Sequence, residues 1–169
     1  MRWVVSCLIP AALALLPMMG QQASGSIEVP SGTRVVLAAR GDGVQIYRCS
    51  EAPGGYKWVL TGPDARLLDD AGLQIGRHFA GPTWKLTDGS QVIGEPMGSK
   101  ASPDAHAVAW LLLRAKSGSA TGKLGDVVFI RRTGTHGGMA DPSGCSSAGD
   151  AGKTARVPYT ATYTFYAER

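Results

Sequence analysis

Charged residues make up only 18% of this chain, which holds three histidines and three cysteines. Turn-forming residues are abundant by contrast, with 23 glycines and 10 prolines. This balance disfavours a charged helical bundle or a disordered chain and favours a β-rich domain with many bends. The net charge of +4 is scattered, so we expect no nucleic-acid partner. Only Arg131 and Arg132 are adjacent among the scattered basic residues, and in a strand they would point to opposite faces.

Several motifs that carry chemistry are missing. Gly41 and Gly43 begin a G-x-G-x-x-G pattern that lacks its third glycine and leads into a strand instead of a helix, so we exclude an NAD-dependent dehydrogenase. There is no P-loop, no G-x-S-x-G elbow and no H-E-x-x-H pattern. We expect no cofactor. A Ser-His-Asp triad stays open, because its members need not be close in sequence.

No apolar run is long enough for a comfortable membrane span. The run from Val4 to Leu16 follows Arg2, is interrupted by proline and precedes small residues at Ala23–Gly25. This pattern predicts a signal peptide over residues 1–25 and a single domain over residues 26–169. The alternative is an uncleaved membrane anchor. After cleavage we expect no membrane span, and a periplasmic or secreted bacterial location.

Cleavage would remove Cys7 and leave Cys49 and Cys145. In an oxidising compartment these two cysteines are expected to form a disulfide bond. The alternative is two separate buried thiols. No C-x-x-C spacing suggests a redox site.

Short alternating segments separated by turn residues predict an all-β fold, an antiparallel β-sandwich or barrel with about ten short strands and long Gly-rich loops. We expect a hairpin turn at Arg40–Gly43, a break at Gly62–Asp64 and a turn at Asp88–Ser90. The segment Val108–Arg114 is apolar on both faces and favours a buried strand over a short helix. Residues 134–153 form the longest predicted loop. The last strand, Val157–Glu168, should turn Val157, Tyr159, Ala161, Tyr163 and Phe165 inward.

The sequence GRHFAGPTW, residues 76–84, predicts a strand end, a Gly-Pro corner and a new strand. We expect Phe79 to point inward. The predicted ligand-binding residues are Arg77, His78 and Trp84 at this corner, with His136 from the long loop nearby. Tryptophans on alternating strands are more often core residues than a stacking platform.

Metal binding is a weaker interpretation. Its candidates are His78, His106 and His136 with Asp88, Asp104, Asp126 or Asp141, but their spacing matches no known metal motif. Each histidine is expected to lie on the surface or in a loop. We therefore predict no metal ion.

Several segments together are similar to a family of secreted bacterial and fungal proteins classified as a domain of unknown function, DUF3455. The resemblance implies an exported single domain, and it assigns no activity and no catalytic residue. Some fungal relatives carry a malate-dehydrogenase-like label, which this chain does not support because it lacks the dinucleotide-binding signature. The matching segments are residues 43–49 (GVQIYRC), 58–72 (WVLTGPDARLLDDAG), 75–84 (IGRHFAGPTW), 109–115 (AWLLLRA) and 157–166 (VPYTATYTFY).

The sequence therefore favours an exported, non-enzymatic β domain that binds a small molecule, a glycan or a protein, or that is associated with the cell envelope. The alternative is a small hydrolase or metal-dependent enzyme using His78, His136 and an aspartate. A third possibility is a structural envelope protein with no pocket. The two histidines distinguish the first two readings, since an enzyme needs them together beside an acid in one pocket.

Overall fold

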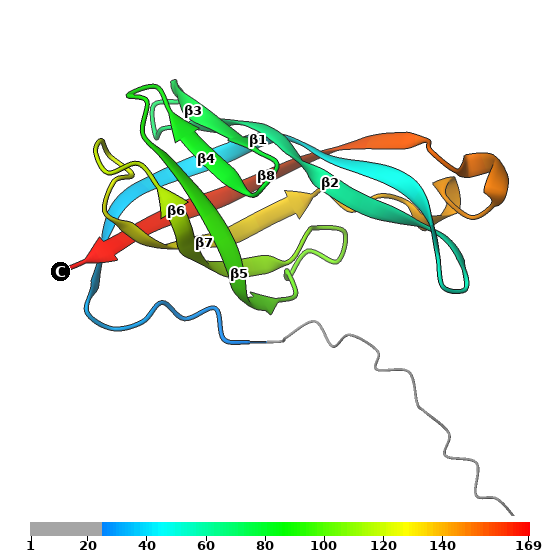
Figure 1. Ribbon diagram of the computed structural model, residues 1–169, viewed down its shortest axis with the longest axis horizontal. Coiled ribbons are helices and arrows are strands. Elements are labelled where there is room, and N and C mark those ends of the chain that lie inside the picture. The colour runs from blue at the N-terminus through cyan, green and yellow to red at the C-terminus, as the bar shows by residue number, and fades with distance from the viewer. Residues whose placement is uncertain (1–24) are drawn as a thin grey trace, which may run out of the picture.

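The computed structural model describes residues 25–169, which fold into a closed barrel of eight antiparallel strands (Figure 1). The predicted signal peptide, apart from Gly25, and Cys7 lie outside the described residues. Each strand pairs with the next along the chain, and β1 pairs with β8 to close the barrel. The all-β prediction is confirmed, and of the two architectures that the sequence left open the chain forms the barrel. The strands are β1 (Thr33–Ala52), β2 (Gly55–Leu68), β3 (Gln74–Phe79), β4 (Thr83–Leu86), β5 (Gln91–Lys100), β6 (Trp110–Gly118), β7 (Val127–Gly137) and β8 (Thr154–Glu168), with short 3₁₀ turns η1 (Pro142–Gly144) and η2 (Ala148–Asp150).

The predicted hairpin turn at Arg40–Gly43 is wrong, because these residues lie within the single long strand β1. Gly41 pairs with Ala161 of β8. A Cβ atom at Gly41 would lie 2.5 Å from Cε2 of Tyr163, far inside van der Waals contact. The glycine therefore makes room for an interior tyrosine ring and does not mark a turn.

Other predicted breaks also lie inside strands, which explains why there are eight strands and not ten. The Gly62–Asp64 break falls within β2, next to a register shift in its pairing with β1. The predicted loop at residues 134–153 is shorter, because β7 continues to Gly137. The prediction of a strand for the segment Val108–Arg114, which is apolar on both faces, is confirmed, since β6 begins at Trp110.

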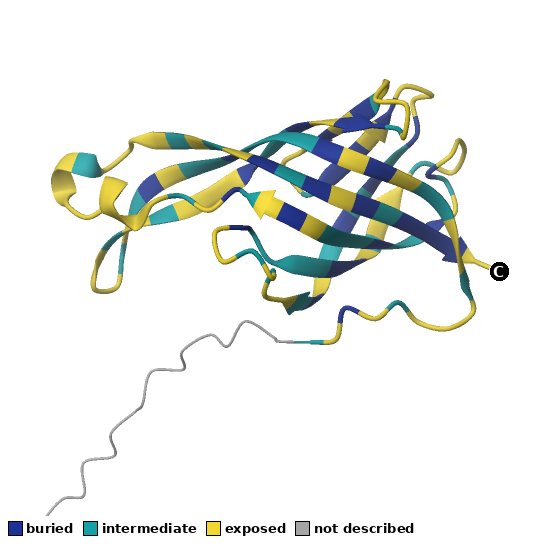
Figure 2. Ribbon diagram, turned by 180° about the vertical axis from the view of Figure 1, so that it is seen from behind, coloured by how far each residue is buried: buried dark blue, intermediate teal, exposed yellow. Residues whose placement is uncertain are grey.

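Interior and exterior positions alternate along the strands (Figure 2). In β8, the predicted inward residues Tyr159, Ala161, Tyr163 and Phe165 are all at most 3% exposed, whereas Val157 is only half-buried. The core they join is continuous with Leu67, Leu86, Val92, Leu124, Val127 and Ile130.

One end of the barrel is closed by Leu124, from the loop between β6 and β7, which is fully buried. Its backbone N–H donates to Ser90 Oγ at 3.2 Å, and the N–H of Lys123 donates to the Asp88 carboxylate at 2.9 Å. The turn at Asp88–Ser90 is where the sequence predicts it, and Gly89 occupies its positive-φ position. The loop that seals the barrel is thus anchored to the β4–β5 turn.

The opposite end carries the β3–β4, β5–β6 and β7–β8 connections. The β1–β2 hairpin and the β7–β8 connection extend beyond the barrel at this end (Figure 1). The predicted disulfide is present: Cys49 of β1 bonds Cys145 after η1, with a Cα–Cα distance of 5.5 Å. It ties the long connection to β1. Within residues 25–169, no helix has the length and apolar character needed to cross a membrane.

Candidate functional site

A cavity of about 290 Å³ occupies the lumen at the end of the barrel that Leu124 does not seal. All eight strands contribute to its wall, so the cavity is enclosed by the barrel itself and is not a surface crease between loops. The lining residues are Gln45, Leu60, Thr61, Gly62, Pro63, His78, Gly81, Pro82, Trp84, Pro96, Leu111, Leu113, Arg132 and Tyr163. Most are apolar or aromatic, with a few polar groups among them, which is the usual make-up of a small-molecule site.

His78 and Trp84 form one wall of the lumen. They are direct cross-strand partners on β3 and β4, joined by the short turn that contains Pro82. Their rings stack in parallel, with centroids 4.3 Å apart and planes 5° apart. The Tyr163 ring lies edge-on to both, at 4.9 Å from His78 and 5.5 Å from Trp84. The three rings make a rigid aromatic surface.

The His78 side chain is neutral at physiological pH. Burial lowers its pKa from 6.5 to about 3, and the Arg132 charge lowers it further, although the bond to the Thr83 carbonyl acts in the opposite direction. Nδ1 lies 2.9 Å from that carbonyl oxygen, which can only accept a hydrogen bond. The proton is therefore on Nδ1, and Nε2 is left as an acceptor.

Two side chains of the lumen carry polar atoms without a hydrogen-bond partner. Gln45 is 1% exposed, and neither its amide oxygen nor its amide nitrogen is paired. The Trp84 indole Nε1 is also buried and unpaired. Leaving a buried donor or acceptor unsatisfied costs about 1–3 kcal/mol per group, so such groups are rare unless something else satisfies them.

Arg132 brings a positive charge to the lumen from β7. Its Nε and Nη2 atoms both donate to the Ala109 carbonyl oxygen, at 3.0 and 2.7 Å. Among residues 25–169, no carboxylate forms an ion pair with it. Its charge opposes the increase in pKa that burial imposes on Tyr47 and Tyr163. Arg132 is therefore held in place by two neutral groups, the Ala109 carbonyl and the Tyr163 hydroxyl, and forms no ion pair among the described residues.

Arg132 also lies where the lumen meets the outside. A second hollow of about 590 Å³ shares Arg132, Pro96 and Leu111 with the lumen and includes the exposed methionines Met97 and Met139. These two hollows together provide an apolar approach to the guanidinium.

The structure brings together two of the four residues that the sequence predicts for a site. His78 and Trp84 line the lumen, whereas Arg77 and His136 do not. Arg77 points outward and pairs with Asp64 at 2.7 Å. The prediction that Phe79 is internal is wrong: Phe79 is 37% exposed and His78 is 2% exposed, because the alternation runs in the opposite sense to the one expected from hydrophobicity. The expectation that His78 lies on the surface is wrong for the same reason.

His136 has an exposed side chain, with Nδ1 3.4 Å from the Asp104 carboxylate. Asp104 also accepts a hydrogen bond from the His106 backbone N–H at 2.9 Å. In the part of the chain that the structure describes, no three His, Cys, Asp or Glu side chains come close enough to hold a metal ion. His78 lines the lumen and His136 is not among the residues that line it.

Sequence reasoning missed Gln45 and Arg132. Both could have been found from strand parity. Gln45 lies four residues before Cys49 and six after Ala39, both buried on the inner face of β1. Arg132 lies two residues after the buried Ile130. A polar residue at an inward position of an apolar strand is the signal in each case.

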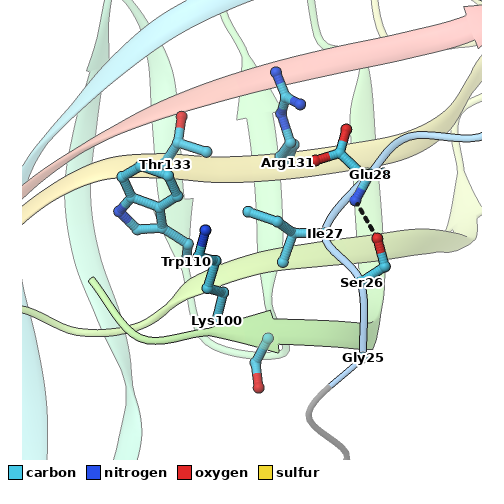
Figure 3. A pocket seen from close by; sticks show the side chains of 9 residues that line it. Gly25, Ser26, Ile27, Glu28, Lys100, Trp110, Arg131 and Thr133 are labelled. Carbon is cyan, nitrogen blue, oxygen red and sulfur yellow. Dashed lines mark hydrogen bonds between the residues drawn. The ribbon is translucent and has the colours of Figure 1, made fainter. Parts of the chain in front are cut away.

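Arg131, the neighbour of Arg132 in β7, lies on the outer face of the barrel wall. It lines an external hollow of about 680 Å³ between β5–β7 and the N-terminal segment 25–28, into which Ile27 points (Figure 3). The Arg131 guanidinium lies 5.7 Å from the centre of the Tyr166 ring. The predicted opposite orientation of the two adjacent arginines is thus confirmed.

The chain belongs to the family described as protein of unknown function (DUF3455), whose pattern it matches over residues 30–167. The match spans the whole barrel, from just before β1 to near the end of β8. No curated protein and no solved structure matches the chain.

Proposed function

We propose that this protein is an exported, non-enzymatic binding protein that takes up a small molecule in the lumen of its barrel. The observation that carries the proposal is the Gln45 side chain, which is almost fully buried beside an open cavity with neither amide atom paired. A ligand that hydrogen-bonds to this amide would supply the partners that no other side chain or backbone group provides.

The barrel itself is suited to this role. The hydrophobic core and Leu124 seal one end, and the cavity lies at the other, so a ligand has a single closed floor against which to rest. The stacked rings of His78 and Trp84 are held by direct strand pairing and do not depend on mobile loops. A preorganised wall of this kind reduces the entropy lost on binding.

Export is supported by the signal-peptide pattern at residues 1–25 together with the disulfide bond between β1 and the β7–β8 connection. Disulfides form and persist in the periplasm and outside the cell. His78 lines the lumen without His136, which favours binding over hydrolysis.

The test is two-dimensional ¹⁵N–¹H NMR of the protein over residues 26–169 with a set of small aromatic compounds. We expect at least one compound to shift the Trp84 indole N–H and the Gln45 side-chain signals while leaving the Trp58 indole unmoved. Trp58 is a suitable internal control, because its Nε1 already donates to the Asp141 carbonyl oxygen at 2.8 Å.

A filled-lumen variant, Leu111→Trp, should abolish these shifts, since the larger ring would occupy the cavity that Leu111 lines. Shifts that persist unchanged in this variant would place binding elsewhere. A set of compounds that moves neither lumen signal would contradict the proposal.

A further inference from the structure

We infer that the lumen ligand is a small aromatic carboxylate with a hydrogen-bonding substituent on its ring, its carboxylate held by Arg132 and its ring lying in the lumen. The inference rests on the proposed function and names the class of ligand for that site. Three independent properties of the cavity lead to it: its charge, its shape and its unpaired polar groups.

The first property is the positive charge that Arg132 brings to the cavity. A half-buried guanidinium with no acidic partner among the described residues is costly, because its desolvation is not repaid by an opposite charge. The Ala109 carbonyl oxygen occupies Nε and Nη2, and the Tyr163 hydroxyl accepts a further hydrogen bond from the guanidinium, but an arginine has five N–H donors. The donors left over, with the positive charge, match the oxygens of a carboxylate. An organic cation would be repelled.

The second property is the shape of the cavity, meaning its size and the character of its wall. A cavity of about 290 Å³ equals the volume of about ten water molecules at ~30 Å³ each. This space accommodates a single substituted ring. His78, Trp84 and Tyr163 present rings to the lumen, and Leu60, Leu111 and Pro63 complete an apolar lining. A flat apolar body fits such a surface.

The unpaired groups come third. The Gln45 amide offers one acceptor and one donor group, and the Trp84 indole offers a donor. Beside them, the neutral His78 ring has its proton on Nδ1, so its Nε2 can accept a hydrogen bond. A bare benzene ring would satisfy none of them. A hydroxyl or carbonyl substituent pairs with one or more of these groups, which is why we include it in the ligand class.

The test uses three compounds of nearly equal size: 4-hydroxybenzoate, its neutral amide 4-hydroxybenzamide and the cation 4-hydroxybenzylamine. Dissociation constants at pH 7 are measured by following the Trp84 indole N–H signal. We expect the carboxylate to bind at least about tenfold more tightly than the amide, since charge-assisted hydrogen bonds are roughly twice as strong as neutral ones. The cation should bind most weakly.

Arg132→Met should weaken the binding of 4-hydroxybenzoate by about ten- to a hundredfold and leave the dissociation constant of 4-hydroxybenzamide nearly unchanged. Arg131→Met is the matched control, because it removes the same charge one residue away on the outer face, and should leave both affinities unchanged. Arg132→Lys keeps the charge without the guanidinium fork and should fall between wild type and Arg132→Met. If Arg132→Met does not fold, the comparison of the three compounds on the wild-type protein still decides.

The outcomes separate the two proposals. The carboxylate inference would be overturned if 4-hydroxybenzoate and 4-hydroxybenzamide had equal dissociation constants by the Trp84 indole N–H signal. It would also be overturned if Arg132→Met bound 4-hydroxybenzoate as tightly as the wild type does. Either result would leave the proposal of lumen binding intact. No binding by these or any other aromatic compounds would overturn both.

Discussion

The neutral, buried His78 predicts that the protein loses stability in acid well before most of its carboxylates titrate. Burial lowers the pKa of His78 from 6.5 to about 3 in the folded protein. Between these two values the unfolded chain binds a proton that the folded protein excludes, so the free energy of unfolding falls as the pH falls from about 6.5 towards 3.

The magnitude follows from the same two values. A difference of one pKa unit corresponds to about 1.36 kcal/mol between the protonation states. Lowering the pH from 7 to 4.5 should therefore cost about 2.5 kcal/mol through His78 alone. The loss reaches about 4 kcal/mol when the pH equals the folded pKa of about 3.

The assay is urea unfolding at pH 7 and pH 4.5 of the wild type and of His78→Phe. Phenylalanine keeps a flat ring against Trp84 but cannot take up a proton. The variant will differ in stability at pH 7, because it loses the bond to the Thr83 carbonyl, but only the change between the two pH values is compared. Every other titrating group contributes equally to both proteins and cancels.

We expect the wild type to lose about 2.5 kcal/mol more than His78→Phe over this interval. A second variant, His78→Gln, should show the same reduced pH dependence, although it lacks the ring. Equal pH dependence in the wild type and both variants would refute the reasoning, since it would mean that His78 titrates alike in the folded and unfolded chain.

Two further predictions concern the barrel and its closure. Replacing Cys49 and Cys145 with serine opens a loop with a sequence separation of 96 residues, which should lower the free energy of unfolding by about 4–5 kcal/mol on the chain-entropy model; the check is urea denaturation, and a loss below about 1 kcal/mol would contradict it. Leu124→Ala should cost about 2–5 kcal/mol, because it empties a fully buried position at the sealed end. Leu73→Ala, at a leucine that is 66% exposed, is its matched control and should stay within about 0.5 kcal/mol of wild type in the same experiment.

Much of the architecture follows from local pattern. The alternation along β8 correctly placed Tyr159, Ala161, Tyr163 and Phe165 inside, because side chains of a strand point to opposite faces with a period of two. The disulfide followed from cysteine count and expected export. The opposite orientation of Arg131 and Arg132 followed from the same period of two. These features need no knowledge of which strands meet.

Glycine was the main source of error in the strand boundaries. Gly41 and Gly62 look like turn residues in the sequence, but both lie within strands. A glycine relieves crowding as well as permitting turns, and only its neighbour on the adjacent strand tells the two apart. At Gly41 that neighbour is Tyr163, which is 122 positions away in the chain.

By itself, then, the sequence determined the all-β class, the covalent link between Cys49 and Cys145 and the membership of the DUF3455 family, because local periodicity and residue counts carry that information. Only the tertiary structure decided that the sheet closes into a barrel and that Gln45, His78 and Arg132 converge on one lumen. The physical reason is that parity along a strand identifies two faces but not which of them is internal. Closure of the sheet makes that choice, and here it places an unpaired amide, a neutral imidazole and a positive charge inside.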